Sequence, residues 1–176
     1  THAPDMMNAR RKAWRFAREY EAGAPGILLH GPAGTGKTYL MIAMMRYLIV
    51  NRSIRVRFVE LMHLLSELRA TYGDRGQAET VMGPLVEVPV LAIDELGKGR
   101  GSDWELSVLD ELISKRYNAQ RTTLFTTNYG LDAEPVPQME SLQDRVGIRI
   151  YSRLMEMCQP VRLCGTDYRR TALTSD

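Results

Sequence analysis

Eight residues near the start of the chain carry a pattern that wraps a backbone around phosphate groups. The stretch Gly31–Thr38 reads GPAGTGKT and matches G-x-x-x-x-G-K-[ST] in full. Its glycines let backbone N–H groups point inward, and the positive end of a following helix adds to the attraction. Lys37 is expected to contact the β- and γ-phosphates of ATP, and the Thr38 hydroxyl to ligate Mg²⁺. The residues predicted here to bind the nucleotide are Gly31, Pro32, Ala33, Gly34, Thr35, Gly36, Lys37, Thr38 and Tyr39.

Two adjacent acids end the apolar run Val90–Ile93. Carboxylates at the end of a buried strand are costly unless they face a cation or a reaction centre. We therefore expect Asp94 to hold Mg²⁺ with Thr38, directly or through water, and Glu95 to act as general base on an attacking water. An Asp-Glu pair after a strand is often only a helix cap or part of a solvated loop, but its place after the glycine-rich loop favours the functional interpretation. Glu95 also distinguishes an ATP-hydrolysing enzyme from a nucleotide switch.

A polar amide follows another predicted strand. Asn128 comes after the β-branched and aromatic run Thr122–Thr126. The carboxyl ends of parallel strands border the crevice where open α/β sheets bind ligands. Asn128 is thus expected to orient the attacking water together with Glu95. Alone it would be interpreted as a turn residue before Tyr129 and Gly130, but the two motifs above favour a catalytic role.

Three arginines recur at four-residue intervals towards the end of the chain. Arg145, Arg149 and Arg153 would share one face of a helix predicted over Leu142–Met157, beside an apolar stripe that packs onto the sheet. No matched acid lies one turn away. The arginines therefore form either a solvated edge or a finger that reaches the ATP of a neighbouring subunit. The spacing leaves both interpretations open.

Basic residues also cluster in two other places. A helix predicted over Asn8–Glu21 carries five of them, and a glycine-flanked loop after the acidic pair carries Lys98 and Arg100. Both groups are candidates for contact with a nucleic acid backbone. A solvated face is the favoured interpretation for the helix, whereas the loop is the better candidate because it directly follows the catalytic strand. The five helix residues are Arg10, Arg11, Lys12, Arg15 and Arg18.

Short apolar runs alternate with amphipathic segments along the chain. Predicted strands cover residues 27–30, 55–59, 90–93, 122–126 and 161–163. Predicted helices cover residues 8–21, 37–50, 61–68, 78–86, 102–117 and 142–157. This alternation indicates an α/β fold whose parallel sheet is covered on both faces. We expect a single domain, with a basic helix and linker over 1–25, a core over 26–164 and a tail over 165–176.

The composition is that of an ordinary globular protein. Of the 176 residues, 44% are hydrophobic and 25% charged, and a net charge of +2 does not by itself indicate nucleic acid. No apolar run approaches the roughly 20 residues that span a bilayer. The basic N-terminal segment lacks the apolar core of a signal peptide, so a cytoplasmic protein without membrane contact is expected. Cys158 and Cys164 are expected to be reduced and to act as small buried hydrophobes.

Together these motifs resemble the AAA+ superfamily of P-loop ATPases, and more closely its DnaC/DnaI helicase loaders and IstB transposon ATPases. The motifs that carry the resemblance are the Walker A stretch Gly31–Thr38, the Walker B stretch Leu91–Glu95 with Leu96-Gly97, the sensor-1-like Thr126-Thr127-Asn128, the box VII-like Ser152-Arg153-Leu154 and the ending Asp167-Tyr168-Arg169-Arg170. The resemblance implies a five-stranded parallel sheet and a homo-oligomer with ATP at its subunit interfaces. It also implies Arg153 as the arginine finger, with Arg149 second, and Arg169 as a phosphate contact.

The resemblance further implies a function in loading a replicative helicase onto single-stranded DNA. Two departures qualify this expectation. The helicase-binding domain that loaders carry before their ATPase domain is not found ahead of the strand at Ile27, so either it has been removed or the partner contact lies elsewhere. The 12 residues after Cys164 are also too few for the usual AAA+ helical lid. The second departure fits the loader and IstB branch. Two alternatives stay open, an IstB-like ATPase that binds duplex DNA for a transposase and a nucleotide switch that acts only on a protein partner. A small-molecule kinase is disfavoured because Glu95 and Asn128 have no evident task in such chemistry.

Overall fold

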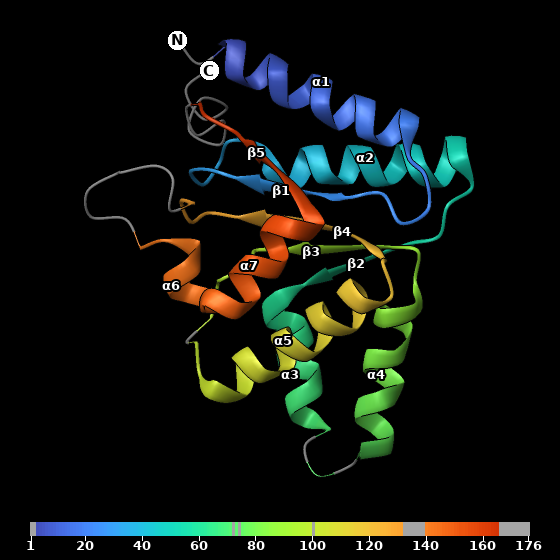
Figure 1. Cartoon of the computed structure of the whole chain (residues 1–176), viewed down its shortest axis with the longest axis vertical. Helices are drawn as coiled ribbons and strands as arrows, with labels where there is room; N and C mark the ends of the chain where they lie inside the picture. The colour runs from blue at the N-terminus through green and yellow to red at the C-terminus, as the bar shows by residue number, and fades with distance from the viewer. Residues whose placement is uncertain (1–2, 72, 74, 100, 132–139, 166–176) are drawn as a thin grey trace, which may run out of the picture.

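A five-stranded, all-parallel sheet forms the centre of the molecule, with strand order β2-β3-β4-β1-β5 (Figure 1). The computed structural model describes residues 3–71, 73, 75–99, 101–131 and 140–165. The strands are β1 (Gly26–His30), β2 (Val56–Glu60), β3 (Val90–Asp94), β4 (Thr122–Thr127) and β5 (Cys158–Arg162). The predicted parallel sheet is therefore confirmed. The last strand begins three residues earlier than the sequence indicates.

Helices cover both faces of this sheet (Figure 1). One face is covered by α1 (Ala3–Glu19) and α2 (Lys37–Arg52), and the other by α3 (Leu61–Ala70), α4 (Arg75–Glu87), α5 (Asp103–Asn118), α6 (Leu142–Val146) and α7 (Ile148–Met157). Alternate residues of β1 point into two separate cores, Ile27 and Leu29 towards α1 and α2 and Leu28 towards the other helices. Because β1, β3 and β4 lie between two helical layers, all their residues are buried. None of the helices in the described part of the chain has the length and apolarity needed to cross a membrane.

The N-terminal basic helix packs along α2. Ala9, Ala13 and Ala17 are buried at four-residue spacing, and Trp14 makes an edge-on contact with Tyr47 at 4.9 Å between ring centroids. The arginines at 10, 11, 15 and 18 are exposed, as expected for the polar face of such a helix. The helix begins at Ala3, earlier than predicted, and places its first turns near the end of β1 where the glycine-rich loop starts.

The prediction of one continuous helix over Leu142–Met157 is wrong, because Gly147 divides it into two helices. Gly147 adopts φ 80° and ψ 155°, so α6 ends there and a second helix, α7, begins. Arg145 consequently lies on α6 and does not share a helix face with Arg149 and Arg153. The apolar stripe survives the break, because Leu142, Val146, Ile150 and Leu154 are all buried. Glycine reaches this backbone conformation without the steric cost that a side chain would add.

A buried arginine ties the sheet to the helices below it. Arg116 on α5 is fully buried and makes five hydrogen bonds, to carbonyl oxygens at the end of α4 and to the start of β4. Burial lowers the pKa of Arg116 to about 10, which leaves the guanidinium charged at neutral pH. Hydrogen bonds to a charged donor are strong enough to offset much of its desolvation. Arg116 therefore fixes the carboxyl end of α4 against β4.

Candidate functional site

The glycine-rich loop connects β1 to α2 and contacts the end of β5. Gly31 adopts φ 136°, and a Cβ atom there would lie 2.1 Å from the carbonyl oxygen of Leu163. Gly36 adopts φ 88° and forms the N-terminal cap of α2 without a side chain in the way. Only glycine fits both positions, the first by close approach and the second by conformation. The two glycines therefore determine the path of the loop between β1 and the start of α2.

Lys37 lies inside this loop. Its side chain is only 6% exposed, and its ammonium donates to the carbonyl oxygens of Gly31 at 2.8 Å and Pro32 at 2.7 Å. The Thr35 hydroxyl donates to the same Pro32 carbonyl at 2.9 Å. A cation is thus held at the centre of the loop, beside the N-terminal end of α2, where an anion would gain from both the charge and the helix dipole.

Thr38 and Asp94 lie in direct contact. The Thr38 hydroxyl donates to the Asp94 carboxylate at 3.0 Å, although the residues are 56 positions apart in the chain. Asp94 also accepts a hydrogen bond from the Thr126 hydroxyl and is only 8% exposed. The structure therefore brings together the two oxygen donors that the sequence predicts to hold Mg²⁺. A hydroxyl and a carboxylate are the hard ligands that this ion prefers.

The remaining ligands of such an ion would come from phosphate and water. Among the residues that the structure describes, no three or more His, Cys, Asp or Glu side chains are grouped closely enough to hold a metal ion. Mg²⁺ is commonly bound through one or two carboxylates and substrate phosphates, so the pair Thr38 and Asp94 fits a nucleotide-bound Mg²⁺.

Glu95 follows β3 in a left-handed backbone conformation, with φ 59°. Its N–H donates to the Thr126 hydroxyl at 3.0 Å, so one threonine of β4 contacts both acids. The Glu95 carboxylate forms an ion pair with Lys98. The hydrogen bond and charge of Glu95 raise the pKa of Lys98. A non-glycine residue with positive φ costs conformational energy and is often found at functional sites.

A cavity of about 660 Å³ lies between the glycine-rich loop, β3 and β4, within the size range of small-ligand sites. It brings together the predicted residues 34–39, Glu95 and Asn128. Of the other predicted loop residues, Gly31 and Pro32 hold Lys37 through their carbonyls, and Ala33 is exposed beside them. Tyr39 lines the cavity with a side chain that is 80% exposed.

The cavity is also lined by four residues that the sequence motifs do not assign to nucleotide binding, one of which is Leu40 on α2. Met6 and Arg10 reach it from α1, and Thr126 reaches it from β4. A signal existed for Thr126, since it directly precedes Thr127 and Asn128 at the end of a strand. Arg10 was noticeable only as one of several basic residues, and nothing in the sequence distinguishes Met6. Their placement depends on how α1 packs across the end of the sheet.

The arginines that were candidates for the finger form ion pairs with acids away from the nucleotide cavity. Arg149 and Arg153 on α7 both form ion pairs with Asp110 on α5, at 3.3 and 2.7 Å. Arg145 instead binds the loop after β3 and pairs with Glu140. Among the described residues, those that line the cavity include none of these arginines. The acid that pairs with Arg149 and Arg153 comes from another helix, which explains why the sequence around them shows no partner, whereas Glu140 lies five residues before Arg145 and directly precedes α6. Arg100 and Arg169 lie outside the described residues.

With this geometry established, comparison with known proteins identifies the family. The family model described as IstB-like ATP binding protein matches residues 12–174. This chain belongs to the IstB-like ATP-binding protein family. The resemblance to the IstB branch of the AAA+ superfamily is therefore confirmed.

Helicase loaders are among the relatives of this IstB-like chain. It is 26% identical over 150 residues to the replicative helicase loader DnaC of Escherichia coli (strain K12). This match covers 85% of this chain and 58% of that protein. The crystal structure of the DnaC helicase loader superposes with a TM-score of 0.78 at 28% identity, over 88% of this chain and 87% of that one. The crystal structure of DnaI gives 0.72 at 27% identity, over 93% and 84% of the two chains. The P-loop AAA+ fold is thus confirmed, and the chain spans less than two thirds of the full-length DnaC sequence.

Proposed function

We propose that this chain binds ATP with Mg²⁺ and hydrolyses it to ADP and phosphate. The observation that carries the proposal is the 3.0 Å contact between Thr38 and Asp94, beside a cavity that Lys37 and Glu95 also line. A nucleotide site needs a cation for the phosphates and oxygen ligands for Mg²⁺, and hydrolysis needs a base on the far side of the γ-phosphate. Residues suited to all three tasks lie at the same edge of the sheet, after β1 and β3, and this supports the proposal.

Each side chain then has a definite task. The loop amides and Lys37 bind the phosphates, while Thr38 and Asp94 hold Mg²⁺. When bound, Mg²⁺ neutralises negative charge on the β- and γ-phosphates. Glu95 accepts a proton from the water that attacks the γ-phosphorus, and Asn128 orients that water. The bond from the γ-phosphorus to the bridging oxygen breaks, and ADP carries the electron pair away.

The hydrolysis proposal is tested by Glu95→Gln. This variant keeps the shape of the side chain but removes its basicity, so phosphate release at saturating ATP should fall by about 10²–10⁴. Binding of a fluorescent ATP analogue should be retained, because Lys37 and the loop are unchanged. Lys37→Ala should instead lose nucleotide binding. Unchanged turnover in Glu95→Gln would exclude Glu95 as the base.

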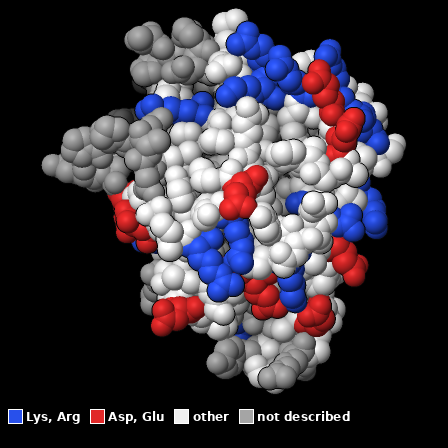
Figure 2. Space-filling view, in the orientation of Figure 1, with Lys and Arg blue, Asp and Glu red and all other residues white. Residues whose placement is uncertain are grey.

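We further propose that ATP lies at the interface of a homo-oligomer, with Arg153 as the finger and Arg149 as second candidate. Among the described residues that line the cavity neither arginine is present, so a role at ATP would require the nucleotide of a neighbouring subunit. Figure 2 shows a group of basic side chains over α5 and α7, where these two arginines lie. A finger supplied in trans contributes about 10³–10⁵ in rate in other nucleotide hydrolases.

As the biological function we propose a DnaC/DnaI-like loading of a replicative helicase onto single-stranded DNA. Similarity to a protein named replicative helicase loader supports it, as does the structural match to the DnaC and DnaI crystal structures. Exposed arginines along α1 offer a surface for a phosphate backbone, and Figure 2 shows these basic side chains gathered along one side of the molecule. A cytoplasmic location follows from this function.

The family match favours a second candidate, an IstB-like ATPase that binds duplex DNA for a transposase. The two functions differ in the form of DNA that they require. Fluorescence anisotropy with labelled single-stranded and duplex oligonucleotides, in ATP, ADP and a non-hydrolysable analogue, at low and high salt, separates them. An ATP-dependent preference for single strands that Lys37→Ala abolishes supports the loader, and a preference for duplex supports the transposition ATPase. Binding to neither, with ATP binding intact, leaves a nucleotide switch acting on a protein partner.

A further inference from the structure

The residues directly after Glu95 turn back towards it. The Lys98 N–H donates to the Glu95 carbonyl at 3.0 Å, and the Lys98 ammonium forms an ion pair with the Glu95 carboxylate. The two side chains are 56% and 31% exposed. An exposed pair of this kind usually has little effect, because both side chains lose conformational freedom when they associate. Here the backbone on each side of the pair is fixed by other contacts, so formation of the pair costs no additional backbone freedom.

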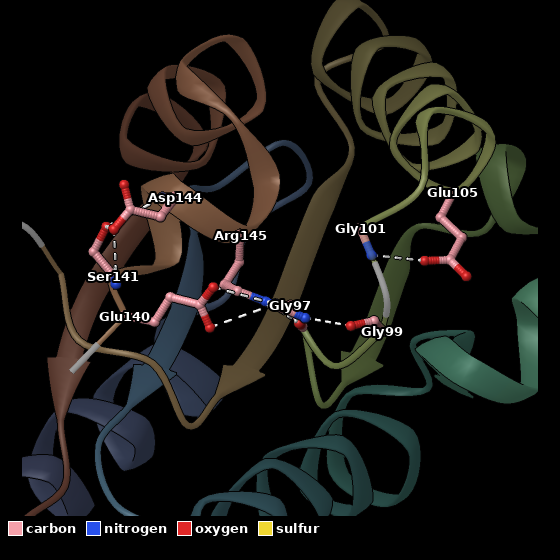
Figure 3. A network of polar contacts seen from close by, with 8 residues as sticks. All are labelled: Gly97, Gly99, Gly101, Glu105, Glu140, Ser141, Asp144 and Arg145. Carbon is pink, nitrogen blue, oxygen red and sulfur yellow. Dashed lines mark hydrogen bonds and ion pairs between the residues drawn. The ribbon is translucent and has the colours of Figure 1, made fainter. Parts of the chain in front are cut away.

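Arg145 holds the loop on either side of Lys98 (Figure 3). Its guanidinium donates to the Gly97 carbonyl at 3.1 Å and to the Gly99 carbonyl, and it pairs with Glu140 at 3.3 Å. The guanidinium also lies over the ring of Tyr129, 5.3 Å from its centroid. With a side chain only 18% exposed, Arg145 is a rigid support for the loop.

The far end of the loop is held by Glu105. Its carboxylate accepts from the Gly101 N–H at 3.0 Å and caps the start of α5 (Figure 3). Arg69 pairs with this carboxylate at 3.5 Å and lies over the Trp104 ring. At the near end, the Thr126 hydroxyl fixes the Glu95 backbone. Lys98 and Glu95 are thus brought together by anchors that come from β4, α5 and α6.

We infer that Lys98 is a positioning residue that restrains Glu95 and lowers the rate of ATP hydrolysis. This rests on the proposed function, in which Glu95 is the general base. While one Glu95 oxygen accepts a hydrogen bond from the ammonium, the carboxylate is less available to take a proton from water. Among the described residues that line the nucleotide cavity Lys98 is absent, so the restraint acts on turnover and not on ATP binding. Arg145 sets the restraint indirectly by fixing the loop.

The test compares steady-state ATP turnover of the full chain with that of Lys98→Met. We expect kcat to rise about two- to five-fold, the factor that corresponds to the free energy of an exposed ion pair, with KM for ATP unchanged. Lys98→Arg preserves the pair and should stay at the wild-type rate. Lys115→Met is the matched control, since it removes a lysine that pairs with Glu111 at 2.8 Å on α5. It should leave both constants unchanged.

Two further variants separate restraint from a general structural effect. Arg145→Gln should raise kcat in the same direction, and the double variant Lys98→Met with Arg145→Gln should gain no more than Lys98→Met alone. A loosened fold would lower kcat in both variants. Equal or lower kcat in Lys98→Met, with Glu95→Gln inactive, overturns the restraint and leaves the proposed hydrolysis intact. Unchanged turnover in Glu95→Gln overturns the role of Glu95 itself.

Discussion

Asp110 on α5 accepts a hydrogen bond from Arg153 on α7, at 2.7 Å between Oδ1 and Nη1. The other oxygen of the same carboxylate pairs with Arg149 at 3.3 Å. One acid therefore orients both arginines that are proposed to reach a neighbouring nucleotide. The side chains are held on the same face of α7 before any neighbour is present, which lowers the entropy that a finger must lose when it binds phosphate.

The first prediction concerns a finger that acts between subunits. Arg153→Ala should lower ATP turnover by about 10³, because the transition-state charge loses its stabilising cation. Mixing Arg153→Ala with Glu95→Gln should restore part of the activity, since an interface can combine an intact base from one chain with an intact finger from the other. Phosphate release is measured as the mixing ratio varies.

Asp110→Ala is the companion variant. It should lower turnover less than Arg153→Ala does, because the guanidinium remains but is no longer held in place. If mixing gives only the sum of the two residual activities, the finger does not act in trans. If Arg149→Ala reproduces the loss and Arg153→Ala does not, the two candidates exchange roles.

The second prediction concerns Mg²⁺. Asp94→Asn should raise the Mg²⁺ concentration needed for half-maximal turnover more than about ten-fold, because loss of even an outer-shell partner of a metal costs that much. Thr38→Ala should shift the midpoint in the same direction. Mg²⁺ titrations at constant ATP give these midpoints. Asp103→Asn, an exposed acid in the first turn of α5, is the control and should show the wild-type midpoint.

The third prediction concerns the two thiols. Burial raises the pKa of Cys158 well above its ordinary value of 9.0, and its sulfur donates to the Thr123 carbonyl at 3.3 Å. Cys164 is half-buried. Because the thiolate is the reactive form, iodoacetamide should label Cys164 first in the folded protein at pH 8, and Cys158 only on unfolding. Mass spectrometry of peptides from a labelling time course measures both rates.

The same pKa shift has a consequence for stability. The folded state binds the Cys158 proton to higher pH than the unfolded state does. The contribution of Cys158 to the free energy of unfolding is therefore fully present below the pKa of the unfolded state, and it is lost as the pH rises above about 9. Urea midpoints should fall between pH 8 and pH 10, and they should fall less in Cys158→Ala. Equal falls in both proteins would assign the pH dependence to other groups.

The fourth prediction concerns Arg116. Arg116→Met has a similar volume but removes the hydrogen bonds that the carbonyl oxygens of Leu85 and Thr122 accept from the guanidinium. The free energy of unfolding should fall by about 3 kcal/mol, as expected when buried polar groups lose their partners. Arg121→Met removes an exposed arginine nearby and should change stability by no more than about 0.5 kcal/mol. Urea denaturation followed by circular dichroism measures both, and a loss equal to the control would show that water replaces the guanidinium.

The sheet and the phosphate-binding loop could be predicted because their signals are local. Gly31–Thr38 specifies a loop and a helix start within eight residues, and apolar runs such as Val90–Ile93 mark buried strands. The meeting of Thr38 and Asp94 followed from topology, since the carboxyl ends of all parallel strands lie at one edge of the sheet, and only β4 separates β1 from β3. These features depend on short segments and on a general rule of α/β folds.

The contacts that were not predicted join elements far apart in the chain. The pairing of Arg153 with Asp110 depends on how α7 crosses α5, and no local pattern encodes that crossing. The break at Gly147 lies inside an uninterrupted apolar stripe, so periodicity alone favours one helix. Lys98 was recognised as a cation near the catalytic strand, but its contact with Glu95 depends on a turn that Arg145 supports from α6.

The contact between Gly31 and Leu163 determines when the phosphate-binding loop is completed during synthesis of the chain. The Leu163 N–H donates to the His30 carbonyl at 2.8 Å, and the Gly31 backbone lies directly against Leu163. One wall of the phosphate-binding loop is thus synthesised long after the loop itself. A nascent chain that contains Gly31–Thr38 but not yet β5 lacks that wall, and the edge of β1 that pairs with β5 is exposed. Capture of nucleotide during translation should therefore occur late, when the last strand has left the ribosome and closed the sheet.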